Sequence, residues 1–331
     1  MYINGLFGLQ TGVWSFSGSY YEKLKVCRPD EFDVMIMLDV KPSVFKLEWE
    51  RSPNEGYVKL KRVELASAMQ KSPWSAYMTD DGNYLSPIKI RRRFFELLKE
   101  VTKSTGKMKV NVEEHGPAVQ LTFTNGHDDT IAEADMVLCV GFPEAWPQHA
   151  IVEKKGISPA LLEKMKSKGF HVVPKTFAES DVKTWRVSFS VCEKELLLHK
   201  IECNAKNVLK FVKFLREKHE LVLPGISSYH LKNIFLELAL VKHKTTLADT
   251  DHFMDSVTKL LSALLDALTL GKLWHFFNSG CNLLLQLRSG DQKKSIKTIE
   301  QLLDLLRSND EEHIKEMIHA PLPNICSCVS L

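Results

Sequence analysis

Apolar residues in the first half of the chain occur in short, often alternating runs, a pattern typical of β-strands. The strongest run is Glu31–Val40, EFDVMIMLDV, and segment 44–65 predicts two strands around the turn SPNEG. A basic helix is expected to begin at Pro87 and to end near Gly106. Segment 117–142 predicts two more strands around the polar turn NGHDD.

From about residue 156 onward the apolar spacing changes to that of helices. Ser158 is a plausible N-cap and Gly169 a plausible stop for the first of them. Further helices are expected within 207–219, 228–242, 253–277 and 295–308. The fold class is therefore α+β with two lobes, namely a mixed-sheet lobe over 1–155 and a mainly helical lobe over 156–320, followed by a flexible tail over 321–331.

Composition excludes several classes of protein. The chain has 331 residues, 44% hydrophobic and 26% charged, and a net charge of only +3, so any nucleic-acid surface must come from local clustering of basic residues. Seven cysteines without a CxxC pair favour reduced thiols in a cytosolic protein. No apolar run approaches the length of about 18 residues that a membrane span needs.

Two acids near the start of the strongest strand suggest metal chemistry. Residues two apart on a strand project from the same face, about 6.6 Å apart, so Glu31 and Asp33 are expected side by side. Their mutual repulsion is relieved by a cation, and hard oxygen ligands suit Mg²⁺ or Mn²⁺. A two-ion site needs a third acid, for which Asp135 is the best candidate and Glu133 a rival. The plain alternative is that each is a solvated strand residue.

A small-residue turn precedes these acids. Gly18 allows close approach of the backbone to a triphosphate, and the hydroxyls of Ser17 and Ser19 supply hydrogen bonds. Eleven residues, 20–30, separate this turn from Glu31. The combination of turn, paired acids and a distant strand acid matches the general layout of nucleotidyltransferases.

These stretches together resemble the cyclic GMP-AMP synthase family and its animal relatives, the cyclic GMP-AMP synthase-like receptors. The resemblance rests on GSYYEKLKVCRPDEFDVMIML, on GPAVQLTF followed by EADMVL, and on the blocks TWRVSFSVCEKELL and SSYHLKNIFLE. It covers essentially the whole chain in the right order. It implies a bilobal nucleotidyltransferase fold and a cyclic dinucleotide product made from ATP and/or GTP in innate immune sensing.

The resemblance also implies a role for individual residues. Glu31, Asp33 and Asp135 would hold two Mg²⁺ or Mn²⁺ ions, and Ser17, Gly18 and Ser19 would bind the donor triphosphate. The remaining nucleotide-binding positions would be Arg186, Ser188, Ser190, Glu193, Lys213, Ser228, Tyr229 and Lys232.

One departure from vertebrate members bears on the activator. Their zinc-binding thumb uses one histidine and three cysteines, whereas the matching run here offers only His199 and Cys203. Two ligands do not complete a tetrahedral site, so no structural zinc is expected. The resemblance to invertebrate relatives that lack the thumb implies double-stranded RNA, rather than DNA, as the first hypothesis for the activator. The candidate nucleic-acid-binding residues are Arg91, Arg92, Lys99 and Lys103. Whether two copies assemble on the ligand stays open.

Other interpretations remain. The chain could be a catalytically silent family member that acts as a scaffold or developmental factor, or an enzyme with a linear product. The last four residues, CVSL, match a prenylation motif at Cys328, and a single lipid there would anchor the otherwise cytoplasmic protein only weakly to a membrane. A chance match in the tail is the alternative.

Overall fold

The computed structural model describes most of the chain in two compact units. The units fall within Met1–Glu22, Pro29–Pro147 and Glu163–Glu195 for the first, and within Lys23–Arg28, Gln148–Leu162 and Leu196–Leu331 for the second. The described residues are 11–26, 31–38, 40, 44–50, 55–63, 73–103, 109–125, 127, 129–143, 145–147, 157–178, 180–218, 223–242, 247 and 252–308.

Nine strands among these residues form one mixed sheet in the first unit. They are β1 (Thr11–Ser17), β2 (Glu31–Leu38), β3 (Phe45–Trp49), β4 (Tyr57–Arg62), β5 (Lys109–His115), β6 (Ala118–Thr124), β7 (Thr130–Phe142), β8 (Phe170–Val173) and β9 (Thr184–Ser188). Their order across the sheet is β1-β2-β7-β8-β9-β4-β3, and the β5–β6 hairpin joins at β7. Only the β2–β7 pairing is parallel among these ladders.

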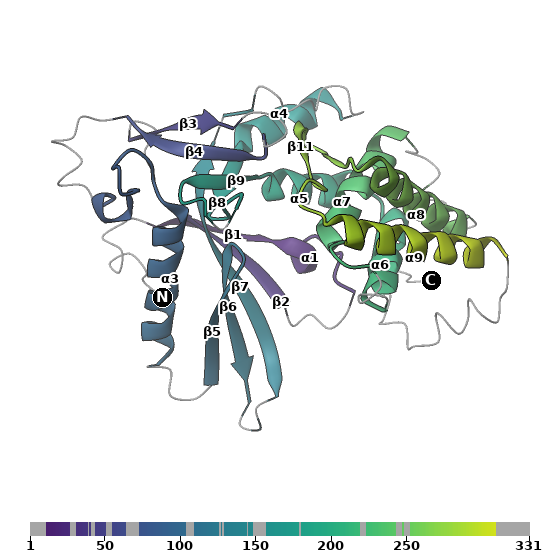
Figure 1. The fold of residues 1–331 in the computed structure, drawn as a ribbon, viewed down its shortest axis with the longest axis horizontal. Coiled ribbons are helices and arrows are strands. Elements are labelled where there is room, and N and C mark those ends of the chain that lie inside the picture. The colour runs from purple at the N-terminus through teal and green to yellow at the C-terminus, as the bar shows by residue number, and fades with distance from the viewer. Residues whose placement is uncertain are drawn as a thin grey trace. The chain divides into compact units, whose positions relative to one another are not determined.

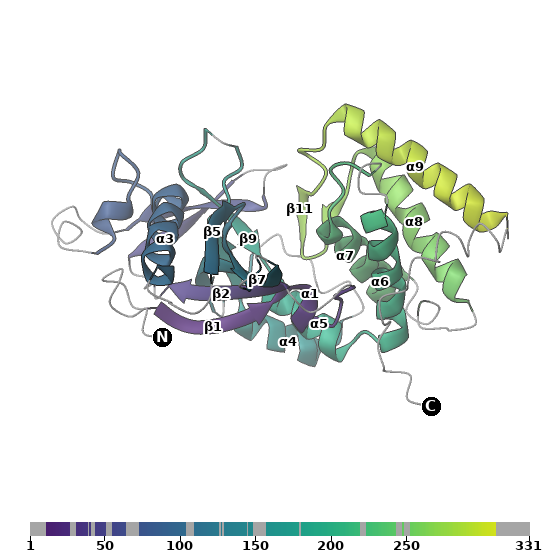
Figure 2. The ribbon, with the colours of Figure 1, turned by 90° about the horizontal axis from the view of Figure 1, so that it is seen from below.

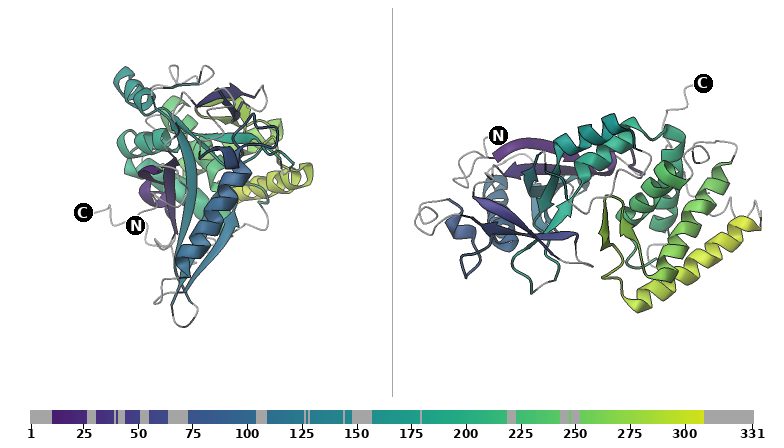
Figure 3. Two further views of the ribbon diagram at one scale, coloured as in Figure 1. Left: turned by 90° about the vertical axis from the view of Figure 1, so that its left-hand side faces the viewer. Right: turned by 90° about the horizontal axis from the view of Figure 1, so that it is seen from above.

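One face of this sheet forms the core of the unit. Val34, Ile36 and Leu38 on β2 are buried, as are their alternating counterparts on β7. Helix α3 (Pro87–Thr102) contributes the buried side chains Ile90 and Phe94 to the core and packs against β5 and β6, as Figure 1 and the left view of Figure 3 show. The other face of β2 carries the acids Glu31 and Asp33 at its start, followed by Met35, which is buried in a smaller cluster with Cys139 and Val173.

The predicted elements of the first half are confirmed, but four strands are additional. Strands β3 and β4, helix α3 from Pro87, and strands β6 and β7 lie where the pattern predicts them. β1, β5, β8 and β9 were not predicted, because they are short or polar, or stand among helical segments. The expected boundary at residue 155 also differs from the observed units, since β8, β9 and the part of α5 (Ser190–His199) up to Glu195 follow it in sequence yet belong to the unit that contains the sheet.

Helices dominate the second unit. They are α6 (Cys203–Lys218), α7 (Ser228–Glu237), the π-helix η2 (Leu238–Lys242), α8 (Phe253–Leu270) and α9 (Ser289–Arg307). α8 packs against α6, α7 and α9, and its long contact with α9 is visible in Figure 2. The remaining helices within the described residues are α1 (Gly18–Tyr21), η1 (Ser75–Tyr77) and α4 (Pro159–Lys168).

The helix predicted over 253–277 is shorter than expected. α8 ends at Leu270, and Gly271 follows it with a φ of 64°, the left-handed conformation that terminates helices. Beyond it, β10 (Trp274–His275) pairs antiparallel with β11 (Asn278–Asn282), whose sequence NSGCN is mostly polar. A glycine at position 271 was therefore a stop signal that the apolar periodicity concealed.

None of the helices in the described ranges is long and apolar enough to cross a membrane. Cys328 and the CVSL motif lie outside the described residues, so prenylation stays a prediction.

Low pH is expected to destabilise the protein through protonation of His171 on β8. The side chain is only 6% exposed, its Nδ1 has no hydrogen-bond partner among the described residues, and burial lowers its pKa from 6.5 to about 4. Since the unfolded chain binds this proton first, the contribution of neutral His171 is complete above pH 6.5 and is lost as the pH falls toward 4. By pH 5 the cost is about 2 kcal/mol.

Urea unfolding at pH 7.5 and pH 5 measures this effect. The replacement His171→Phe keeps a large ring without a titrating group, and it is expected to shrink the loss of stability between the two pH values. An equal loss in both proteins would contradict the assignment.

Candidate functional site

The parallel pairing of β2 with β7 places four acids side by side. Glu31 pairs with Glu133, and Asp33 pairs with Asp135. Paired residues on neighbouring strands project from the same face, with the strands about 4.8 Å apart. All four carboxylates therefore stand on the face opposite the buried core, so the register alone does not decide between Asp135 and its rival Glu133.

Gly18 lies against the Asp33 carboxylate. The residue has a φ of 79°, and a Cβ atom placed there would overlap the Asp33 carboxylate oxygen. Ser17, at the end of β1, is buried and pairs with Asp33 across the β1–β2 ladder. A residue without a side chain is thus required for the backbone at Gly18 to approach the Asp33 carboxylate. This role adds to the predicted one, in which the same backbone approaches a triphosphate. Ser19 follows within α1 and is half-buried.

Asp135 has the environment most suited to a cation. Its side chain is 15% exposed, and its Oδ1 has no hydrogen-bond partner among the described residues, while Oδ2 lies 3.7 Å from His115 Nδ1. Burial raises the pKa of Asp135, and the nearby Glu31 carboxylate raises it further, against the opposing effect of His115. A bound cation would favour the charged form, and an unsatisfied carboxylate oxygen is an available ligand.

The acids do not form a closed ligand set as they stand. No three His, Cys, Asp or Glu side chains within the described part of the chain are grouped closely enough to hold a metal ion. Two of the acids have other neighbours: the Asp33 carboxylate lies against Gly18, and the Asp135 carboxylate faces His115. The register brings the acids to one face, and rotation of their side chains would have to complete a site.

Arg186 and Ser188 lie on the same face of the sheet. Arg186 pairs with Val173, which packs in a small buried cluster with Met35, two residues along β2 from Asp33. Ser190, the first residue of α5, lies 3.0 Å from the same methionine, measured from Oγ to Sδ. Arg186 and Ser188 thus share the acid-bearing face of the sheet, and Ser190 contacts Met35 on that face.

Lys175 is a site residue that the sequence did not single out. It is half-buried, and its pKa is lowered by burial and by the neighbouring Arg186 charge. No acid in the described ranges forms an ion pair with it. Two adjacent cations of this kind favour an anionic ligand. The available signal was a lysine directly after the apolar strand FHVVP.

Two other predicted nucleotide-binding residues, Glu193 and Lys213, are buried. Glu193 on α5 is only 1% exposed. Lys213, on α6 in the second unit, is 7% exposed, and its ammonium donates a hydrogen bond to the Leu24 carbonyl at 3.0 Å. Lys213 therefore fixes the segment that follows α1, and any contact with a phosphate would have to share the ammonium with that bond.

Tyr229 is held by a buried histidine in the second unit. The Phe277 amide donates to His275 Nδ1, so the proton of this ring lies on Nε2 and is donated to the Tyr229 hydroxyl at 2.7 Å. Lys232 Nζ stands 5.2 Å from the centre of the tyrosine ring. Ser228, Tyr229 and Lys232 lie on the first turns of α7 and are half-buried. His275 gave no sequence signal, because its partners are distant in the chain.

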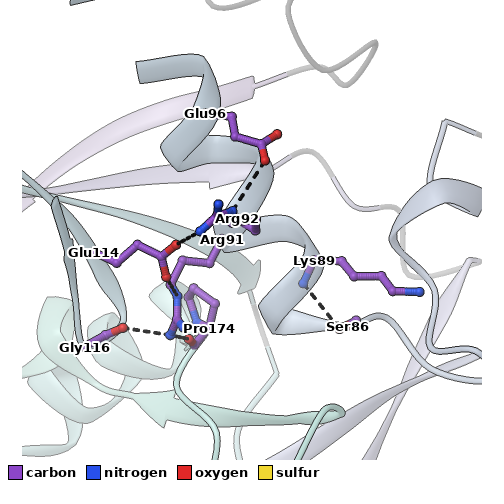
Figure 4. Close-up of polar contacts among 8 residues, drawn as sticks. All are labelled: Ser86, Lys89, Arg91, Arg92, Glu96, Glu114, Gly116 and Pro174. Carbon is purple, nitrogen blue, oxygen red and sulfur yellow. Dashed lines mark hydrogen bonds and ion pairs between the residues drawn. The ribbon is translucent and has the colours of Figure 1, made fainter. Parts of the chain in front are cut away.

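The basic residues of α3 differ in what they contact. Arg91 and Arg92 both form ion pairs with Glu114, and Arg91 also donates to backbone carbonyls (Figure 4). Lys99 lies over the Phe95 ring at 4.9 Å, and Lys103 is exposed at the end of the helix. Arg92, Lys99 and Lys103 therefore remain on the surface, whereas most of the contacts of Arg91 are internal.

Comparison with protein families matches both halves of the chain. Residues 20–199 match the Mab-21 protein nucleotidyltransferase domain, and residues 204–301 match the Mab-21 protein HhH/H2TH-like domain. The first match alone covers more than half of the 331 residues.

Individual relatives agree with this assignment. The chain is 29% identical to cyclic GMP-AMP synthase of Mus musculus, over 82% of this chain and 56% of the relative. It is 27% identical to cyclic GMP-AMP synthase-like receptors of Magallana gigas, over 87% of this chain and 50% of the relative, and of Aethina tumida, over 90% and 76%. The chain spans about half the length of the first two. With its acid-bearing sheet and both domains in order, the chain belongs to the Mab-21 nucleotidyltransferase family.

Proposed function

We propose that this protein is a nucleotidyltransferase that makes a cyclic dinucleotide from ATP and/or GTP when a nucleic acid binds, as a signal in innate immunity. The observation that carries the proposal is the shared sheet face, on which Asp33 and Asp135 pair in register and which Arg186 and Ser188 on β9 also share. Its relatives named cyclic GMP-AMP synthase support the product class.

The acids fit a divalent metal by their chemistry. Glu31, Asp33 and Asp135 would hold Mg²⁺ or Mn²⁺, two ions in all, and the orphan Oδ1 of Asp135 is a ready ligand. When bound, such ions neutralise a triphosphate and favour ionisation of an attacking hydroxyl.

The protein's own residues would position the two nucleotides. The turn at Gly18 and Ser19 would take the donor triphosphate, while Arg186, Ser188 and Ser190 would orient the acceptor. Lys175 would add positive charge at Arg186. The acceptor hydroxyl would attack the α-phosphate, the α–β phosphoanhydride bond would break, and pyrophosphate would leave, twice per product. The other nucleotide contacts would come from Glu193, Lys213, Ser228, Tyr229 and Lys232.

Double-stranded RNA is the proposed activator, because the chain has only His199 and Cys203 where a zinc thumb would need four ligands. An A-form duplex is recognised by shape and phosphates, for which Arg92, Lys99 and Lys103 offer an exposed basic surface on α3. The surface ion pairs of Arg92 with Glu96 and Glu114 are weak enough to be exchanged for phosphates. Action in the cytoplasm, assembly of two copies on the ligand, and weak anchoring through Cys328 belong to the same proposal.

Incubation of the purified protein with radiolabelled nucleoside triphosphates and Mg²⁺ or Mn²⁺ tests the proposed function. Reactions with and without double-stranded RNA or DNA are compared after phosphatase treatment. A phosphatase-resistant product that requires RNA is expected. A phosphatase-sensitive oligonucleotide would instead support a linear product, and the absence of any product from folded protein would favour the scaffold hypothesis.

Asp33→Asn is expected to lower synthesis roughly a hundredfold or more, because a metal site loses a charged ligand. Binding of the activating nucleic acid should stay unchanged, which fluorescence anisotropy measures. Glu133→Gln, on the same face, is the matched control and is expected to keep its synthesis. A loss as large as that of Asp33→Asn would instead identify Glu133 as the third metal ligand. Near-normal synthesis by Asp33→Asn would contradict the metal assignment.

Gly18→Ala is expected to lower synthesis about tenfold or more, because the added methyl group displaces the Asp33 carboxylate and the backbone there has a positive φ. Gly290→Ala places the same methyl group in open space on α9 and serves as control. Equal rates for the two variants would show that the contact between Gly18 and Asp33 is unimportant.

A further inference from the structure

A single arginine on α3 holds two turns of the sheet. Arg91 Nη1 donates to the Gly116 carbonyl at 2.8 Å and to the Pro174 carbonyl at 3.4 Å, as Figure 4 shows. Its Nε lies 3.3 Å from Glu114 Oε2, which is an ion pair by distance although the atoms are not aligned for a hydrogen bond. The side chain is only 23% exposed. Arg91 is therefore bound on three sides.

The first of these turns carries the neighbour of Asp135. The β5–β6 hairpin closes through Gly116, whose φ of 58° suits the first central position of a two-residue turn. Glu114 and the Gly116 carbonyl are held by Arg91, while His115 between them reaches Asp135 at 3.7 Å. Successive residues of a strand project to opposite faces, so holding the outer two fixes the direction of the middle one.

The second turn carries the cation beside Arg186. The Lys175 amide donates to the Val173 carbonyl at 2.8 Å, which makes a three-residue turn centred on Pro174. The fixed φ of proline suits such a turn. Because Arg91 holds the carbonyl of Pro174, it fixes the peptide bond that leads into Lys175.

We propose that Arg91 is a positioning residue, which sets the distance between the hairpin tip at His115 and the turn at Lys175 on the two flanks of the candidate site. This inference rests on the proposed function. A guanidinium has five donors in a rigid plane and can bridge both carbonyls and the carboxylate at once. A lysine ammonium at the end of a flexible chain lacks that fixed geometry.

Arg91→Gln tests this role, and Arg93→Gln is the matched control. Both remove one positive charge from α3, but Arg93 forms ion pairs only with Glu96 and Glu100, both at 3.8 Å, among the described residues. Hydrogen exchange of the free protein is expected to rise in segments 111–118 and 173–178 of Arg91→Gln alone. Unchanged exchange in both segments would overturn the proposal, whether or not the protein makes a nucleotide product.

Kinetics then separate positioning from a merely structural role. At saturating nucleic acid, Arg91→Gln is expected to lower kcat about tenfold with a smaller change in KM, and Arg91→Lys to recover part of the loss. Because Arg91 acts partly through Lys175 and partly through the His115 hairpin, the loss in the double variant Arg91→Gln/Lys175→Met should be smaller than the product of the two single losses.

Two kinetic outcomes would contradict the proposal. A kcat equal to that of Arg93→Gln despite faster exchange, or losses that multiply in the double variant, would overturn the positioning role. If the wild-type protein makes no product under any condition, the proposed function fails, and hydrogen exchange still decides whether Arg91 sets the two turns.

Discussion

The parallel ladder between β2 and β7 is the constraint on which the candidate site depends. The register of this ladder sets the position of every acid on the two strands, since Asp33 lies opposite Asp135 only in this alignment. A shift by one residue would turn the acids into the core and the apolar residues to the site face. Burial of Val34, Ile36 and Leu38 on the opposite face therefore fixes the position of the carboxylates, and stability of the core and geometry of the site have the same origin.

Charge on the site face is arranged in two groups of opposite sign. Carboxylates gather where β2 and β7 run side by side, and burial, with the Glu31 carboxylate, raises the pKa of Asp135. Cations gather at the neighbouring β8–β9 region, where burial, with the Arg186 charge, lowers the pKa of Lys175. Such a division suits a polyanionic substrate that brings its own cations, because each protein charge then meets an opposite one. Arg91 connects the two regions through backbone carbonyls.

The sequence was sufficient for the elements with strong periodicity and for the residue types of the site. Alternation along β2, the start of α3 at Pro87, and the acids at Glu31, Asp33 and Asp135 were all evident from the chain. Strands β1 and β5 were not, because an edge or polar strand is recognised only by its ladder partners, and β8 and β9 were not, because they are short and stand among helical segments. The π-helix η2 and strand β10 were hidden in apolar runs that also suit a helix.

What the sequence determined by itself is the chemistry available: acids two apart on a strand, a glycine before them, and a family likeness that orders them. Tertiary structure decided which groups meet. Gly18 contacts Asp33, Lys175 lies beside Arg186, and Arg91 turns inward instead of joining a uniform basic surface. The physical reason is that these contacts join residues far apart in the chain, and local propensity carries no information about partners that only the sheet register brings together.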